Sequence, residues 1–249
     1  MGNLTNKVVL VTGAANNIGK GIAYKFAQEG ANTVIVDYNA EEGRKTADEL
    51  TQNYNRSLFI QADVSDPKAM IKVREEVLNT FKQIDVLVLN AGIGNKNKVN
   101  DITYEEWNKM LSINLSGLFN TVKAFYEDFL INNGAIVYIG SGSALSGTGG
   151  GVSYPASKAG GEGLMRGLAK ELGPKGVNVN TIAPRLIDTG MLSVSHPTKE
   201  SLAKAIQEVP VGRLGTIEDI ANLTYFLADP VNSYIQGQTI LLDGGRTIG

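Results

Sequence analysis

The stretch KVVLVTGAANNIGKGIAYKFAQE, residues 7–29, decides the fold. A continuous apolar run over 7–12 leads into a turn of small residues over 12–19, and apolar side chains at helical spacing follow over 17–29. A continuous apolar run predicts a strand that is buried on both faces, as in a parallel sheet. We therefore expect a strand, a tight turn and a helix in direct succession.

The same alternation continues along the chain. Apolar runs predict further strands at 33–37, 57–63, 85–90, 135–141, 177–183 and 238–243. Amphipathic stretches predict helices at 40–53, 66–81, 104–130, 154–172 and 216–227. This pattern favours an α/β fold of the Rossmann type, with a doubly wound parallel sheet of about seven strands and helices on both faces. We expect one domain over 1–249, with an irregular substrate loop at about 188–210.

Composition excludes several classes of function. The formal net charge of -2 offers no broad positive field, so we expect neither nucleic acid nor a membrane as a partner. Cysteine is absent, which excludes disulfides, thiolate nucleophiles and cysteine metal ligands, and no metal site is expected. The short polar start at 1–7 leaves no room for a signal peptide, and no apolar run is long enough for a membrane span. We expect a cytoplasmic protein.

The turn after the first strand predicts a dinucleotide site. Small residues let the backbone approach a pyrophosphate, which then lies at the N-terminus of the helix. The residues expected to contact the cofactor here are Gly13, Asn16, Asn17, Ile18 and Gly19. Asn17 stands where glycine would be easiest, but asparagine tolerates a positive φ better than most residues.

Asp37 ends the second predicted strand and favours NAD over NADP. A carboxylate there can accept hydrogen bonds from both hydroxyls of the adenosine ribose, and it would repel a 2′-phosphate. Neither Asn16 nor Tyr38 supplies a positive charge that would offset this repulsion. The alternative is that Asp37 caps the helix that begins at Ala40, although Asn39 could serve equally well.

Two further strand ends carry candidate cofactor contacts. Asp63 and Val64 follow the third strand and could meet the adenine, although Asp63 could equally cap a helix. Asn90, Ala91 and Gly92 follow the fourth strand, where small residues would leave room beside the nicotinamide ribose. A plain turn explains Gly92 as well as a cofactor contact does.

A candidate acid–base pair lies on the helix after the fifth strand. Tyr154 and Lys158 are four residues apart and point to one face. An ammonium near a phenol is expected to lower the phenol pKa, so that Tyr154 can exchange a proton with a ketone or alcohol oxygen. Ser141 could hydrogen-bond the same oxygen, and Asn114, inside a predicted helix, could hold a relay water. Taken singly, the pair could be a packed contact and Ser141 a strand-end serine.

Together these residues are similar to the short-chain dehydrogenase/reductase family, in its NAD-preferring branch, over essentially the whole chain. The matching segments are TGAANNIG (12–19), Asp37, Asp63–Val64, NAG (90–92), Asn114, Ser141, YPASK (154–158), IAPRLIDT (182–189) and LLDGG (241–245). The resemblance implies a catalytic tetrad of Asn114, Ser141, Tyr154 and Lys158. It also implies cofactor contacts from Tyr154, Lys158, Pro184, Ile187 and Thr189, the last two at the nicotinamide carboxamide. A mobile loop at 190–210 and a homotetramer built through the long helices are further expectations.

The chain departs from the family pattern at three places. Asn17 replaces the usual middle glycine, Leu89 stands where a second asparagine often precedes Asn90, and Arg185 follows Pro184 where glycine is common. An arginine at 185 could pair with a substrate carboxylate or phosphate, or simply point to solvent. The single histidine, His196, lies in the predicted loop and is expected to be a surface residue.

The leading hypothesis is an NAD(H)-dependent oxidoreductase that interconverts a secondary alcohol and a ketone, on a sugar, polyol or similar small molecule. One alternative is a 3-oxoacyl-thioester (acyl-carrier-protein) reductase, although the missing positive charge at the ribose argues against the usual NADPH preference of that group. A second alternative is an inactive regulator or structural protein that only binds the dinucleotide. An incomplete tetrad would favour it, and here all four positions are filled.

Overall fold

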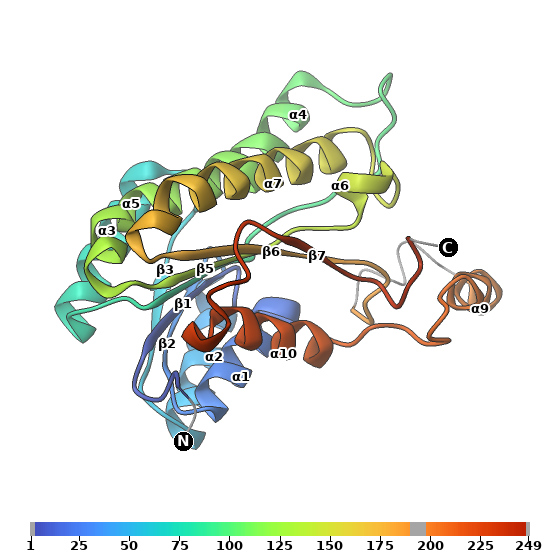
Figure 1. Ribbon diagram of the computed structural model, residues 1–249. Helices are drawn as coiled ribbons and strands as arrows, with labels where there is room; N and C mark the ends of the chain where they lie inside the picture. Colours follow the sequence, from blue (N-terminus) through green and yellow to red (C-terminus); the bar gives the residue numbers. More distant parts are fainter. Residues whose placement is uncertain (1–2, 190–197, 248–249) are drawn as a thin grey trace.

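A seven-stranded parallel sheet forms the centre of the molecule in the computed structural model, which describes residues 3–189 and 198–247. The strand order is β3-β2-β1-β4-β5-β6-β7 (Figure 1). The strands are β1 (Val8–Thr12), β2 (Asn32–Asp37), β3 (Ser57–Gln61), β4 (Val86–Leu89), β5 (Ala135–Ile139), β6 (Asn178–Pro184) and β7 (Thr239–Leu242). The predicted Rossmann-type sheet of seven strands is confirmed.

Helices cover both faces of the sheet (Figure 1). One layer holds α1 (Asn17–Gln28), α2 (Ala40–Asn53) and α10 (Ile217–Ala228), and the other holds α3 (Pro67–Phe81), α5 (Gly117–Asn132) and α7 (Ser153–Leu172). In β1, Val8 and Leu10 pack into the core under α3, α5 and α7, whereas Val9 and Val11 pack into the opposite core. Both faces of β1 are therefore buried, which explains its unbroken apolar sequence.

The helix predicted over 104–130 is interrupted. It consists of α4 (Tyr104–Leu111), a π-helical segment at Ser112–Ser116, and α5. The π-helical segment holds Asn114, whose buried side chain is hydrogen-bonded to the backbone of Ile93. Such single-turn bulges often occur at functional sites.

The segment predicted to be irregular at 188–210 contains a helix, α9 (Lys199–Gln207). The prediction was wrong there because Thr198 and Ser201 form a capping box that starts this helix. A short helix, α6 (Ser143–Ser146), follows β5, and two 3₁₀ turns lie at Gly173–Lys175 and Pro230–Asn232. His196 and the rest of 190–197 lie outside the described residues.

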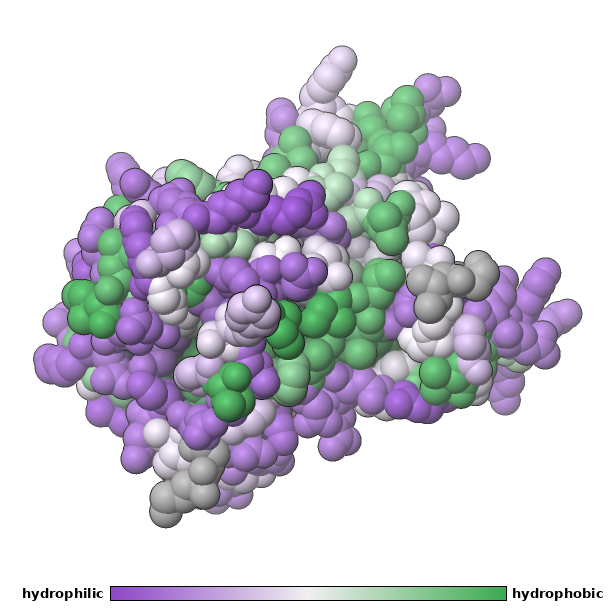
Figure 2. Space-filling view, in the orientation of Figure 1, coloured by the Kyte–Doolittle hydropathy of each residue, from purple (hydrophilic) through white to green (hydrophobic). Residues whose placement is uncertain are grey.

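The strand order reverses beside β1, because β2 and β4 lie on its two sides. The connections from β1 and from β4 therefore leave in opposite directions, and in α/β sheets a ligand binds at the carboxyl ends of the strands beside such a point. The space-filling view, in the orientation of Figure 1, shows a mostly polar surface with apolar side chains gathered near its middle, where Figure 1 shows β7 and α10 (Figure 2). Within the described residues, no helix combines the length and apolar character that crossing a membrane requires.

Candidate active site

The turn between β1 and α1 is packed tightly against the end of β4. Gly13 has a φ of 65°, and a Cβ added to it would lie 2.8 Å from the Cα of Ala91. The Asn90 side-chain amide donates to the carbonyls of Thr12 and Gly13 at 3.0 and 2.9 Å. A Cβ on Gly19 would lie 2.2 Å from the Gly13 carbonyl oxygen. Glycine is therefore required at both positions, because the backbones approach too closely for a side chain.

The N-terminus of α1 is open in a way that suits a phosphate. Its N-cap residue, Asn16, forms no side-chain capping hydrogen bond. Side chains cap α2, α3, α4, α9 and α10, whereas α5, α6 and α7 start without a side-chain cap, as α1 does. Asn17 has a φ of 49°, so asparagine does adopt the left-handed conformation that the sequence required of it. The first turn of α1 thus fits the pyrophosphate of a dinucleotide.

Asp37 is buried at the end of β2, next to this turn. Its carboxylate accepts hydrogen bonds from the backbone N–H of Ala15 and of Asn39, both at 3.0 Å. Asn39 caps α2, because its side chain accepts from the Glu42 N–H. The capping alternative for Asp37 is therefore wrong, and the carboxylate lies beside the turn that would hold the cofactor.

Asp63 does not cap a helix either. Its carboxylate accepts from the backbone N–H and the hydroxyl of Ser65, at 2.8 and 2.7 Å, whereas Asp66 caps α3. Val64 is buried, and a Cβ on Gly117 would lie 2.7 Å from its side chain. Asp63 itself is exposed, and a contact with adenine stays a prediction.

Three of the four predicted catalytic residues meet at the end of β5. Tyr154 and Lys158 project from α7, and Ser141 lies two residues beyond Ile139, the last residue of the strand. The Ser141 side chain lies close enough to the Tyr154 phenol to lower its pKa. The Lys158 ammonium is 5.8 Å from the centre of the Tyr154 ring and donates to the carbonyl of Ile139 at 2.9 Å. Lys158 is only 4% exposed, so its charge lies in the protein interior.

Asn114, the fourth predicted catalytic residue, is hydrogen-bonded to Ile93 and to α7, the helix that carries Tyr154 and Lys158. Its carboxamide is fully buried, accepts from the Ile93 N–H at 2.8 Å, and donates to the Ile93 carbonyl at 2.9 Å. It also donates to the Ser157 hydroxyl on α7 at 3.0 Å. A Cβ on Gly92 would lie 3.3 Å from Asn114 Oδ1 and 3.6 Å from Lys158 Nζ. Gly92 therefore borders the same space as the tetrad.

Burial changes the pKa of both members of the pair. It raises the pKa of Tyr154, and the nearby Ser141 side chain only partly offsets this effect. Burial also lowers the pKa of Lys158 from its ordinary 10.5 to about 8. Desolvation is thus the larger influence on the Tyr154 pKa in this structure, and a lowering of that pKa by Lys158 stays a prediction. Tyr154 is held in its protonated form, as a proton donor must be.

The end of β6 brings the predicted carboxamide segment to the sheet edge. Ile187 is buried and pairs with Gly215 in an isolated parallel bridge, and the Asp188 N–H donates to the Gly215 carbonyl at 2.7 Å. Leu186 has a φ of 49°, which is strained for a bulky residue. Sequence reasoning missed this strain, since no residue-type signal marks a leucine in the left-handed conformation.

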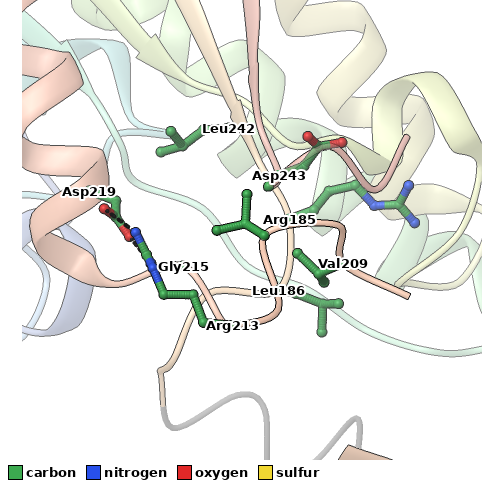
Figure 3. Close-up of a pocket in the computed structure, with 10 residues that line it drawn as sticks. Arg185, Leu186, Val209, Arg213, Gly215, Asp219, Leu242 and Asp243 are labelled. Atoms are coloured by element: carbon green, nitrogen blue, oxygen red, sulfur yellow. Dashed lines mark hydrogen bonds and ion pairs between the residues drawn. The ribbon is translucent and has the colours of Figure 1, made fainter. Parts of the chain in front are cut away.

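Arg185 does not simply point to solvent, and among the described residues it forms no ion pair, so a contact with an anionic substrate stays a prediction. Its stem covers Gly142, where an added Cβ would lie 2.3 Å from Arg185 Cγ. Its guanidinium donates to the hydroxyls of Thr148 and Thr247, both at 3.0 Å. Figure 3 shows it on one side of a pocket whose other side holds the ion pair of Arg213 with Asp219. Arg185 thus links the loop after α6 to the C-terminal segment.

Known proteins resemble this chain over nearly its full length. A family model described as enoyl-(acyl carrier protein) reductase matches residues 13–247. The chain is 36% identical over 244 residues to 3-oxoacyl-[acyl-carrier-protein] reductase FabG of Escherichia coli K12, covering 98% of each chain. It is also 36% identical over 246 residues to (2S)-[(R)-hydroxy(phenyl)methyl]succinyl-CoA dehydrogenase subunit BbsD of Thauera aromatica, again covering 98% of each.

Solved structures give the same result. The crystal structure of the protein named gox2181 superposes with a TM-score of 0.92 at 32% identity, covering 99% of this chain and 97% of that one. Sequence and structure therefore agree over the whole sheet and its helices. The chain belongs to the short-chain dehydrogenase/reductase family of oxidoreductases.

Proposed function

We propose that this protein is an NAD(H)-dependent oxidoreductase that interconverts a secondary alcohol and a ketone. The observation that carries the proposal is the cluster that the half-buried Tyr154 forms with the buried Ser141 and Lys158 at the end of β5. It lies at the same edge of the sheet as the open N-terminus of α1 and the carboxylate of Asp37. The site therefore combines a proton donor with a place for a dinucleotide.

The residues divide the chemistry as follows. A nicotinamide dinucleotide, when bound, supplies or accepts the hydride. Tyr154 donates its phenol proton to the ketone oxygen, and in the reverse direction it removes the proton of the alcohol. The Ser141 hydroxyl hydrogen-bonds the same substrate oxygen and orients it. Lys158 holds positive charge beside the phenolate that forms, and it would also bind the ribose hydroxyls of the nicotinamide.

Asp37 supports NAD over NADP. Its carboxylate is fixed by two backbone N–H groups, so it has little freedom to turn away from a ribose. A 2′-phosphate placed there would meet a like charge. The remaining predicted cofactor contacts, from Asp63 and Val64 to Pro184, Ile187 and Thr189, belong to the same proposal.

The names of the relatives favour thioester substrates over a sugar or polyol. FabG is named for reducing a 3-oxoacyl group on acyl-carrier protein, and BbsD is named for a hydroxylated succinyl-CoA. Both names describe a carbonyl or hydroxyl group in an acyl chain held as a thioester. We therefore rank a 3-oxoacyl or 3-hydroxyacyl thioester as the first substrate class to test. A homotetramer and a cytoplasmic location stay predictions.

One screen tests this proposal. The purified protein is assayed with NADH and NADPH against acetoacetyl-CoA, a keto sugar, a polyol ketone and a keto steroid. We expect reduction of the thioester, with kcat/KM for NADH at least about tenfold above that for NADPH, equivalent to about 1.4 kcal/mol. Faster turnover with NADPH would overturn the assignment of Asp37. Turnover of the sugar alone would overturn the thioester class and leave the hydride-transfer proposal standing.

A further inference from the structure

Tyr138 is a buried tyrosine that the mechanism does not use. It lies in β5 with no exposed surface, on the sheet face that α7 covers. Its hydroxyl is the buried side-chain polar atom that lacks a hydrogen-bond partner within the described part of the chain. A phenol oxygen left in this state costs free energy, whereas a phenylalanine would fill the same space without that cost. The hydroxyl thus gives no reason for a tyrosine here.

The ring of Tyr138 lies beneath the charged end of Lys158. The Lys158 ammonium is 5.1 Å from the centre of the Tyr138 ring and 5.8 Å from that of Tyr154. Both distances fall within the range of cation–π attraction, which is strongest where water is excluded. A Cβ on Gly161 would lie 2.6 Å from the Tyr138 hydroxyl, so α7 approaches β5 closely enough to hold the ring in place.

We infer that Tyr138 is a positioning residue, whose ring supports the Lys158 ammonium from below and keeps it aimed at the Ile139 carbonyl, beside Tyr154. This inference rests on the proposed function only for its consequence in catalysis. The contact itself is a property of the folded chain. It explains how a charge that is almost wholly removed from water is retained at this point.

The titratable groups around Lys158 are few. Tyr154 faces it from α7 and Tyr138 faces it from β5. Glu162 lies one turn further along α7, is half-buried, and pairs with Arg166 at 3.6 Å. Burial is the cause that lowers the Lys158 pKa, and it also raises the pKa of Tyr138. Both tyrosine rings therefore stay neutral near pH 7, and each offers the ammonium a π-face without a charge.

The test is a titration of Lys158 by NMR in protein labelled with ¹³C at the lysine ε-carbon. The signal is assigned by its loss in Lys158→Met. We expect Tyr138→Phe to leave the Lys158 pKa within a few tenths of a unit, and Tyr138→Leu to lower it by about one unit. Phe125→Leu is the matched control, since Phe125 is equally buried in the same core. Phe125→Leu should leave the Lys158 pKa unchanged.

A second series covers the case in which Tyr138→Leu does not fold. Phenylalanines with one, two and three ring fluorines at position 138 keep the shape and progressively weaken the negative face of the ring. The Lys158 pKa should fall step by step along this series. A pKa that is unchanged by fluorination, or by Tyr138→Leu in a folded protein, would overturn the inference. Neither result depends on turnover, so failure of the proposed reaction would leave this test intact.

Discussion

Lys158 carries a charge in a place where the protein would be more stable without it. Its folded pKa of about 8 lies below its ordinary 10.5, so the unfolded chain binds the proton more tightly. Below about pH 8 the full free-energy cost of burying the Lys158 charge is present. The free energy of unfolding of the wild type rises between about pH 8 and 10.5, as the unfolded state loses its extra proton. The destabilisation is consistent with a functional requirement for the ammonium.

Lys158→Met should therefore stabilise the fold by about 1–3 kcal/mol at about pH 7, and this gain should shrink towards about pH 10. Urea unfolding at both pH values measures it. Lys170→Met, an exposed position on the same helix, is the control and should show no such pH dependence. A Lys158→Met protein that is less stable than wild type at about pH 7 would show that the ammonium stabilises the fold instead.

The spacing of Tyr154 and Lys158 was enough to predict that they share one face of a helix. The direction of the Tyr154 pKa was not predictable, because it depends on burial beneath residues distant in sequence. The same applies to Tyr138 and Leu186, whose roles depend on what packs against them and on backbone conformation. Residue types and spacing thus predict which groups meet, but not the dielectric in which they meet.

At the scale of elements, the end of β2 and the start of α1 form one unit. Asp37 accepts a hydrogen bond from the Ala15 N–H of the turn, so the residue that we propose selects the cofactor also holds the turn. Asp37→Asn removes the charge and keeps one oxygen acceptor. We expect it to raise the NADPH to NADH ratio of kcat/KM by about tenfold or more, since the repulsion of a 2′-phosphate is lost.

Asp37→Ala serves as the comparison, because it removes both the charge and the acceptor. It should lower stability by about 1–2 kcal/mol more than Asp37→Asn, measured by urea unfolding. An unchanged cofactor ratio in Asp37→Asn would mean that the preference is set elsewhere.

The elements that sequence reasoning missed were missed for different reasons. The π-helical segment at Ser112–Ser116 exists where Asn114 is bonded to Ile93 and Ser157, and these contacts leave no mark on hydrophobic periodicity. In contrast, α9 had a readable signal in its Thr198 and Ser201 capping box. Short helices such as α6 fall below the length at which periodicity can be recognised.

At the scale of the whole molecule, the alternation of apolar runs and amphipathic stretches predicted the sheet and its two helical layers. This succeeded because the interior strands are buried on both faces, which favours apolar sequence, although β6 also buries Asn178, Asn180 and Thr181. The location of the site could also be predicted, because parallel strands bring their carboxyl ends to one edge of the sheet. The substrate could not be predicted in this way, because the residues expected to enclose it come from several separate segments of the chain.

The central claim is that Tyr154 donates the proton in an NAD(H)-dependent reduction, and Tyr154→Phe tests it most directly. The substitution keeps the ring and removes the only atom that the mechanism asks Tyr154 to use. Turnover with NADH and the best ketone from the screen should fall at least about a thousandfold, equivalent to about 4 kcal/mol of activation free energy, while the Kd for NADH changes by less than about threefold. Retained turnover in Tyr154→Phe, with NADH bound as in the wild type, would contradict the account.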